Sequence, residues 1–155
     1  MRNAIKMVGL VSALVLSACG GDKGDDLGRF VGTWRATAGT LTTVCPGYAP
    51  STDPVTEGIT WSLGVSSDLV TTGTGCAIMA DVAGSTATGA LGLACSSTVS
   101  DGVVAMFTVT SYTFVISPDG HTATENESAG VTFVVDGATI PCTANQTASY
   151  QKIGN

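Results

Sequence analysis

The segment from Cys76 to Cys95 restricts the fold more than any other part of this 155-residue chain. On both sides of Gly84-Ser85-Thr86-Ala87, apolar or cysteine side chains recur at every second position, as in two half-buried strands joined by a turn. A register with Val82 opposite Gly89 aligns both apolar faces and places Cys76 opposite Cys95. We therefore predict a hairpin that is closed by a Cys76–Cys95 disulfide.

The other cysteines extend this covalent framework. The chain has five cysteines, and Cys19 lies in a separate N-terminal segment, so Cys45 and Cys142 pair by elimination. Such a bridge ties the first strand to the last, and these two strands are neighbours in a closed barrel. A four-thiolate metal site is disfavoured, because no two cysteines stand in a C-x-x-C pair. We expect no metal and no other cofactor.

The alternation of apolar and small polar residues continues through the rest of the chain, and residues typical of long helices are scarce. The clearest expected strands are Phe30 to Ala38 with an extension to Val44, Ile59 to Val65, Leu69 to Thr72, Val103 to Ile116, Val131 to Val135 and Ile140 to Tyr150. The sequence therefore predicts an all-β fold: a small, lipocalin-like antiparallel barrel of about eight strands, stapled by two disulfides. A β-sandwich is the alternative.

Four local features refine this picture. The apolar parity changes near Thr110-Ser111, which predicts a β-bulge, and Asp136-Gly137 is a strong hairpin-turn signal. Pro46 to Pro54 contains three prolines and a glycine, so we expect a loop without regular structure. The stretch from His121 to Ser128 has no apolar face, and we expect it at an edge or rim of the sheet.

The N-terminus has the features of an export signal. Arg2 and Lys6 precede an apolar run over 7–16, and Leu16-Ser17-Ala18-Cys19 follows directly. A run of about ten residues suits a signal peptide and is too short to cross a bilayer as a mature helix. The last four residues resemble the lipobox of bacterial lipoprotein precursors; an ordinary secretory signal with a chance cysteine is the alternative.

This resemblance implies that residues 1–18 are removed and that the Cys19 sulfur receives a diacylglycerol, usually with an acyl chain such as palmitate on the new amino group. Several acyl chains anchor a protein firmly to a membrane. Gly20 replaces the Asp that marks inner-membrane retention in enteric bacteria, so the analogy indicates the outer membrane. We expect residues 19–28 to form a flexible tether and residues 29–155 a single β domain.

The charge of the mature chain excludes some partners. Loss of the signal removes Arg2 and Lys6, and leaves four basic residues against twelve acidic ones. Such a chain has no basic patch for phosphates, so nucleic acid is not an expected partner. Anionic lipid head groups would not attract it either, and the lipid on Cys19 must provide the membrane contact.

Gly32-Thr33-Trp34, at the start of the first expected strand, is similar to a motif that opens the first strand of lipocalins and avidins. In lipocalins this Trp closes the barrel floor, and an Arg from the last strand packs on it. The last strand of this chain offers Lys152 instead. More broadly, the chain resembles small, uncharacterised bacterial lipoproteins that are rich in Gly, Thr and Cys.

The sequence contains no motif for catalysis. His121 is the only histidine, it follows a turn, and there is no G-x-S-x-G nucleophile elbow, so we do not expect an enzyme. Asp119, His121, Glu125 and Glu127 could approach a divalent cation. Successive same-face residues lie about 7 Å apart along a strand, however, so residues four apart cannot easily hold one ion without help from other strands, and a solvated polar edge is the preferred interpretation.

The inward-facing aromatic residues allow two interpretations. They could line a pocket for an apolar ligand, or they could fill the barrel, and we favour the filled core. The candidate pocket residues are Trp34, Trp61, Phe107, Tyr112 and Tyr150. The expected function is accordingly a non-catalytic structural or interaction role in the cell envelope with a protein partner. The alternative is a small carrier for a lipophilic molecule.

Overall fold

The computed structural model describes residues 23–72, 76–100 and 103–155, so the expected signal peptide and Cys19 lie outside the described residues. The described residues form one short helix and ten strands. These are α1 (Lys23–Phe30), β1 (Gly32–Val44), β2 (Ser51–Pro54), β3 (Ile59–Leu63), β4 (Leu69–Thr72), β5 (Met79–Ala83), β6 (Thr86–Gly89), β7 (Ala94–Ser100), β8 (Val103–Ile116), β9 (Thr122–Val135) and β10 (Ala138–Gly154).

Eight antiparallel strands form a closed ring. Their hydrogen-bonded order is β10-β9-β8-β6-β5-β4-β3-β1, and β10 pairs in turn with β1. The closing pair is long, from Thr33 opposite Gly154 to Val44 opposite Thr143. Outside the ring, β2 pairs with β1 and β7 pairs with β8. The predicted all-β class with about eight antiparallel strands is confirmed.

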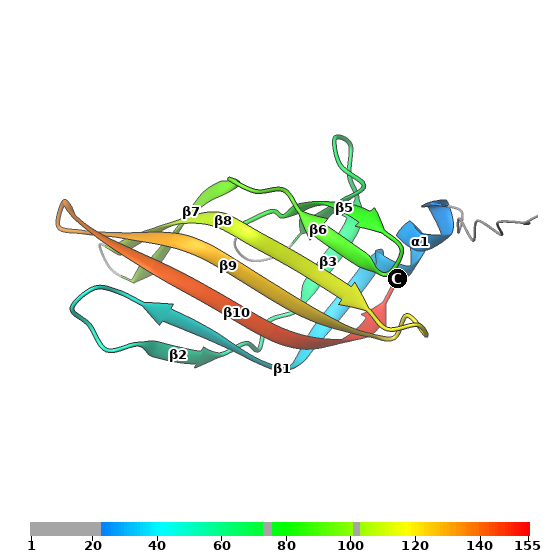
Figure 1. The fold of residues 1–155 in the computed structure, drawn as a ribbon, viewed down its shortest axis with the longest axis horizontal. Helices are drawn as coiled ribbons and strands as arrows, with labels where there is room; N and C mark the ends of the chain where they lie inside the picture. The colour runs from blue at the N-terminus through cyan, green and yellow to red at the C-terminus, as the bar shows by residue number, and fades with distance from the viewer. Residues whose placement is uncertain (1–22, 73–75, 101–102) are drawn as a thin grey trace, which may run out of the picture.

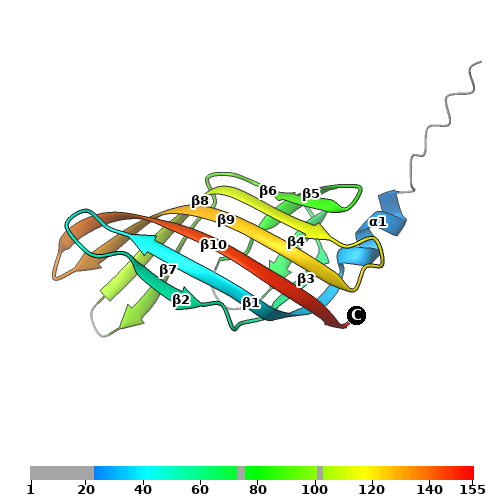
Figure 2. The same ribbon diagram turned by 60° about the horizontal axis from the view of Figure 1, so that its bottom comes forward.

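The two ends of the ring differ. Strands β3 to β6 have four or five residues each, whereas β8 and β9 have fourteen and β10 has seventeen. Figures 1 and 2 show the short strands near α1, and the long strands extending well beyond them at the opposite end. The α1 end is therefore surrounded by all eight strands of the ring, while at the far end the long strands continue beyond β3 to β6, with β2 paired to β1 and β7 paired to β8.

Aromatic residues fill the α1 end of the ring. The side chains of Phe30, Trp34, Trp61 and Phe114 are fully buried. The ring centroid of Phe114 lies 5.3 Å from that of Trp34 and 5.7 Å from that of Trp61, with edge-to-face geometry. Such pairs add to the stabilisation that burial alone provides. This end of the ring is a packed core.

The helix α1 closes this end of the ring. Residues 23–28, which the sequence pattern assigns to a flexible tether, are helical, and Phe30 ends the helix instead of beginning the first strand. Burial of Phe30 in the core explains both differences, since the helix brings its apolar side chain onto the ring. The Trp34 indole donates a hydrogen bond of 2.9 Å to the Phe30 carbonyl, and the Lys152 ammonium lies 5.6 Å from the Trp34 ring centroid.

Both predicted disulfides are present. Cys45 and Cys142 join β1 to β10, with Cα atoms 4.3 Å apart. Cys76 and Cys95 are also bonded, with a Cα separation of 5.5 Å. The predicted pairing of all four cysteines is confirmed.

The predicted register of the Cys76–Cys95 segment is wrong. Val82 lies opposite Ala87, and Gly89 lies opposite Ala80, so the register differs by two residues. The turn is the two-residue type at Gly84-Ser85, with Gly84 at φ +58°, which suits the twist of a tight hairpin. The chain then leaves this hairpin, and Ala94–Ser100 pairs with β8 instead. Leu91, which the predicted register would place opposite Ala80 on the apolar face, is 66% exposed.

Of the other local predictions, two are confirmed and two are wrong at least in part. The bulge is confirmed by a register shift between Val109 and Ser111, and the Asp136-Gly137 turn is confirmed by its two positive φ angles. The expected loop over 46–54 is wrong in part, because Ser51–Pro54 pairs with the outer part of β1. The strand expected over Ile59 to Val65 ends at Leu63, and the side chains of Leu63 and Val65 are exposed.

The expected rim over 121–128 is also wrong. Residues from Thr122 onward belong to β9, which is hydrogen-bonded to β8 on one side and to β10 on the other. Ala123 and Glu125 point into the ring and are buried. The inner face of this strand is polar because it borders a cavity rather than the aromatic core.

Candidate functional site

A cavity of about 510 Å³ lies within the ring, beside the aromatic core. It is lined by the segment over 54–59, the end of β4, the residues that lead into β5, and side chains of β1, β7, β8, β9 and β10. Apolar side chains such as Phe107 and Ile59 form part of its wall. The structure therefore combines a packed core at one end of the ring with a hollow next to it, whereas the sequence favoured a core filled throughout.

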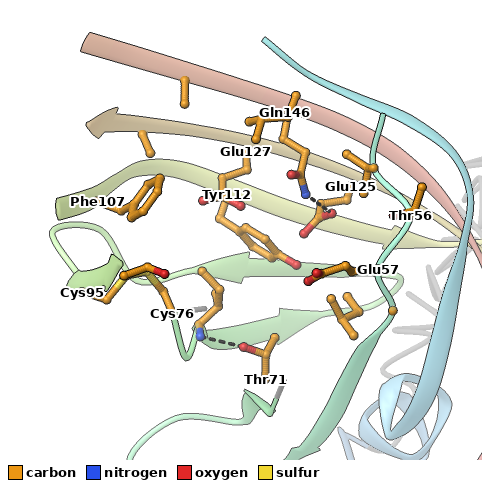
Figure 3. Close-up of a pocket in the computed structure, with 18 of the residues that line it drawn as sticks. Thr56, Glu57, Thr71, Cys76, Cys95, Phe107, Tyr112, Glu125, Glu127 and Gln146 are labelled. Carbon is orange, nitrogen blue, oxygen red and sulfur yellow. Dashed lines mark hydrogen bonds between the residues drawn. A yellow bond between two sulfur atoms is a disulfide. The ribbon is translucent and has the colours of Figure 1, made fainter. Parts of the chain in front are cut away.

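A cluster of polar side chains forms another part of the wall (Figure 3). Glu125 accepts a hydrogen bond of 2.5 Å from the Tyr150 hydroxyl and one of 2.9 Å from the Gln146 amide. Both bonds reach the same oxygen, Oε2. The side chain of Glu125 is only 3% exposed, and a glutamate buried to this extent is normally paired with a cation.

Glu127 lies two residues farther along the same face of β9. Its neighbours across the two ladders are Tyr112 on β8 and Gln146 on β10. Since successive residues of one parity share a face, the register places both carboxyl groups on the cavity side. The pairing of β9 with both β8 and β10 thus brings together side chains that are far apart in the sequence.

The pKa values of Glu127 and Tyr150 are both raised, because these groups lie in a poorly solvated and negatively charged part of the cavity wall. Burial, and then the negative charge of Glu125, raises the pKa of Glu127 to about 7. The same two causes raise the pKa of the Tyr150 hydroxyl, so it remains a proton donor toward Glu125. Among the described residues that line the cavity there is no lysine, arginine or histidine. The wall therefore carries negative charge that no lining cation balances.

Tyr112 has an unusual environment. It is 2% exposed, and within the described part of the chain its hydroxyl has no hydrogen-bond partner. In Figure 3 this hydroxyl points into the space between Glu125 and Glu57. Burial, and then the charge of Glu125, raises the pKa of Tyr112 well above its ordinary value. A buried hydroxyl without a partner requires an explanation, and its position in the cavity wall offers one.

Three of the five predicted pocket residues line the cavity, namely Phe107, Tyr112 and Tyr150. The other two, Trp34 and Trp61, belong to the adjacent core. The sequence pattern did not predict Glu125 and Glu127 as cavity residues. The available signal was the odd parity that they share with Ala123, Ala129 and Val131, since this parity marks an inward face.

The four residues considered as a possible cation site, Asp119, His121, Glu125 and Glu127, do not lie together. His121 and Asp119 are exposed at the turn before β9, whereas Glu125 and Glu127 lie inside the ring. Asp119 accepts hydrogen bonds from the Ser117 hydroxyl and from the His121 backbone N–H. These bonds lower the pKa of the Asp119 carboxyl, with that from Ser117 the largest cause. Asp119 therefore stabilises a turn.

Comparison of the chain with protein-family models, with curated proteins and with solved structures found no significant match. No helix within the described ranges is both long enough and apolar enough to cross a membrane. The candidate site is thus defined by its own geometry: a partly apolar hollow whose lining includes three carboxyl groups, an amide and two phenols.

Proposed function

We propose that this protein binds an apolar or amphiphilic small molecule inside its ring, and that a lipid on Cys19 holds it at the bacterial outer membrane. The protein would act as a carrier or receptor and would catalyse no reaction. Of the two roles that the sequence leaves open, the cavity favours the carrier over the structural or interaction role.

The cavity is the observation that carries this proposal. Ligand sites in proteins commonly have volumes of about 300 to 1,000 Å³ and combine apolar walls with a few polar groups, and the hollow of about 510 Å³ has both properties. A ring of this size whose only role is structural would fill its interior with side chains. This ring is filled at the α1 end and hollow beside it.

The anchor is supported by the sequence. An apolar run over 7–16 followed by Leu-Ser-Ala-Cys resembles a lipoprotein precursor. The first described residue, Lys23, comes four residues after Cys19. Little chain would therefore separate the lipid from the α1 end of the ring.

A neutral fluorescent probe tests the cavity directly. The full chain is produced with Cys19→Ala, so that it carries no lipid, and is titrated with N-phenyl-1-naphthylamine. The variant Ala144→Phe places a large side chain at a buried position of the cavity wall. The matched control is Thr143→Phe, which adds the same side chain at the next residue, on the exposed face of β10.

We expect saturable fluorescence enhancement with the unmodified ring and with Thr143→Phe, and at least a tenfold weaker response with Ala144→Phe. Circular dichroism checks that both variants retain the strand signal. Equal binding by both variants, or no saturable binding by the unmodified ring, would contradict a ligand site in the cavity.

A further inference from the structure

We infer that the ligand of this cavity carries a cationic amine beside its apolar part, and that Glu125 and Glu127 bind the amine. This inference rests on the proposed function, because it specifies the chemistry of a ligand that the ring would hold.

Glu125 supplies the first reason. Its carboxyl group is buried beside the cavity, and its two hydrogen bonds from protein side chains both reach Oε2. Neither bond involves Oε1. Buried carboxylates are normally paired with a cation, and the lining residues include no lysine, arginine or histidine. An ammonium group on the ligand would supply the missing positive charge.

Glu127 places a second carboxyl group on the same side of the cavity. Residues of one parity lie about 7 Å apart along a strand, so a single ammonium group can lie between the two carboxyl groups. The groups that face Glu127 from the neighbouring elements are Tyr112 on β8 and Gln146 on β10. Glu57, on the segment before β3, lines the same cavity. All of these are acidic or neutral, so an anionic ligand would be repelled.

Tyr112 is an independent indication of a ligand. Its hydroxyl is buried, has no hydrogen-bond partner among the described residues, and points between Glu125 and Glu57. A hydroxyl in this position can accept a hydrogen bond from an ammonium N–H. The aromatic rings of Tyr112 and Phe107 also border the cavity, and aromatic faces attract organic cations.

The raised pKa of Glu127 agrees with this assignment. With a pKa of about 7, this carboxyl group is half protonated near neutral pH and becomes fully charged as the pH rises. A bound cation would favour its charged form. Affinity for an amine should therefore increase between pH 6 and pH 8, as long as the amine itself stays protonated.

The test compares three probes with the same tail and different charge: 4-phenylbutylamine, 4-phenylbutanol and 4-phenylbutyrate. Each is titrated calorimetrically at pH 8 into the full chain that carries Cys19→Ala. We expect the amine to bind about tenfold more tightly than the alcohol, as one charge-assisted contact provides, and the carboxylate to bind most weakly.

Three variants test whether Glu125 and Glu127 cause the preference for the amine over the alcohol. Glu125→Gln and Glu127→Gln each remove a carboxylate from the cavity while preserving its shape, and both should reduce the advantage of the amine over the alcohol. Asp81→Asn is the control, because Asp81 is exposed on β5 and its loss changes the net charge equally. It should leave the preference unchanged. Binding of the alcohol by each variant shows that its cavity is intact.

The outcomes separate the two proposals. Equal binding of amine and alcohol, or a preference that survives both Glu→Gln variants, would overturn the amine assignment and leave the carrier function standing. Failure of all three probes to bind would contradict both proposals. If the amine is preferred, the mass of a molecule released from the native protein distinguishes a free amine from a lipid with an amine head group.

Discussion

The Glu127→Gln substitution should make the chain more stable at high pH and have little effect at low pH. In the folded protein, burial and the charge of Glu125 raise the pKa of Glu127 from 4.5 to about 7. The folded state thus holds this proton more tightly than the unfolded state does. The contribution of Glu127 to the free energy of unfolding is therefore most favourable below pH 4.5. It falls as the pH rises to about 7, and it stays constant at higher pH.

The size of the effect follows from the shift. Each unit of pKa corresponds to about 1.4 kcal/mol, so the raised pKa implies a loss of about 3 kcal/mol between pH 4.5 and pH 8. Glu127 is partly exposed, and solvent screening reduces this value to about 2 kcal/mol. Glutamine cannot ionise, so the variant avoids the loss.

The assay is urea unfolding at pH 4.5, 6 and 8, followed by the fluorescence of Trp34 and Trp61, which are fully buried in the fold. The free energy of unfolding of Glu127→Gln minus that of the parent chain should rise by about 2 kcal/mol across this range. Asp81→Asn should show no such rise. A difference that is independent of pH, or that falls with pH, would refute the placement of Glu127 in a poorly solvated, negatively charged cavity.

Three further predictions concern the anchor, the core and the ring closure. Cys19→Ala should release the protein from isolated membranes, and retention as firm as that of the parent chain would contradict the lipid anchor. Phe114→Ala should cost about 3 to 5 kcal/mol in urea unfolding, because Phe114 is fully buried among aromatic rings; a loss below about 1 kcal/mol would show that this end is not tightly packed. Replacing both Cys45 and Cys142 with serine should cost up to about 5 kcal/mol on the chain-entropy estimate, since 97 positions separate them; an unchanged denaturation midpoint would contradict this.

The parity of apolar residues explains which parts of the fold could be predicted from the sequence. A bulge reverses parity, so the change near Thr110-Ser111 revealed it directly. A hairpin shift of two residues preserves parity, so the pattern could not distinguish the predicted register from the one with Val82 opposite Ala87. For the same reason the Cys76–Cys95 pairing is correct although the register behind it was wrong: both cysteines still line the interior.

The candidate site was harder to predict, because its chemistry opposes the usual pattern. A strand whose inner face carries Glu125 and Glu127 looks like a solvated edge when apolar residues alone define the inside. Only the pairing of β9 with both β8 and β10 shows that these carboxyl groups face inward. Long-range pairing of this kind is not encoded in any local stretch. The aromatic cavity residues were easier to predict from the sequence, since Phe107, Tyr112 and Tyr150 follow the expected parity.

The most direct test of a ligand-carrying ring is native mass spectrometry of the protein, gently extracted from the membranes to which we propose that it is anchored. We expect a population whose mass exceeds that of the chain and any lipid on Cys19 by one small molecule, and we expect this molecule to contain an amine. A mass that corresponds only to the chain and any lipid on Cys19, at every extraction condition that preserves the fold, would contradict a ligand-carrying role for the ring.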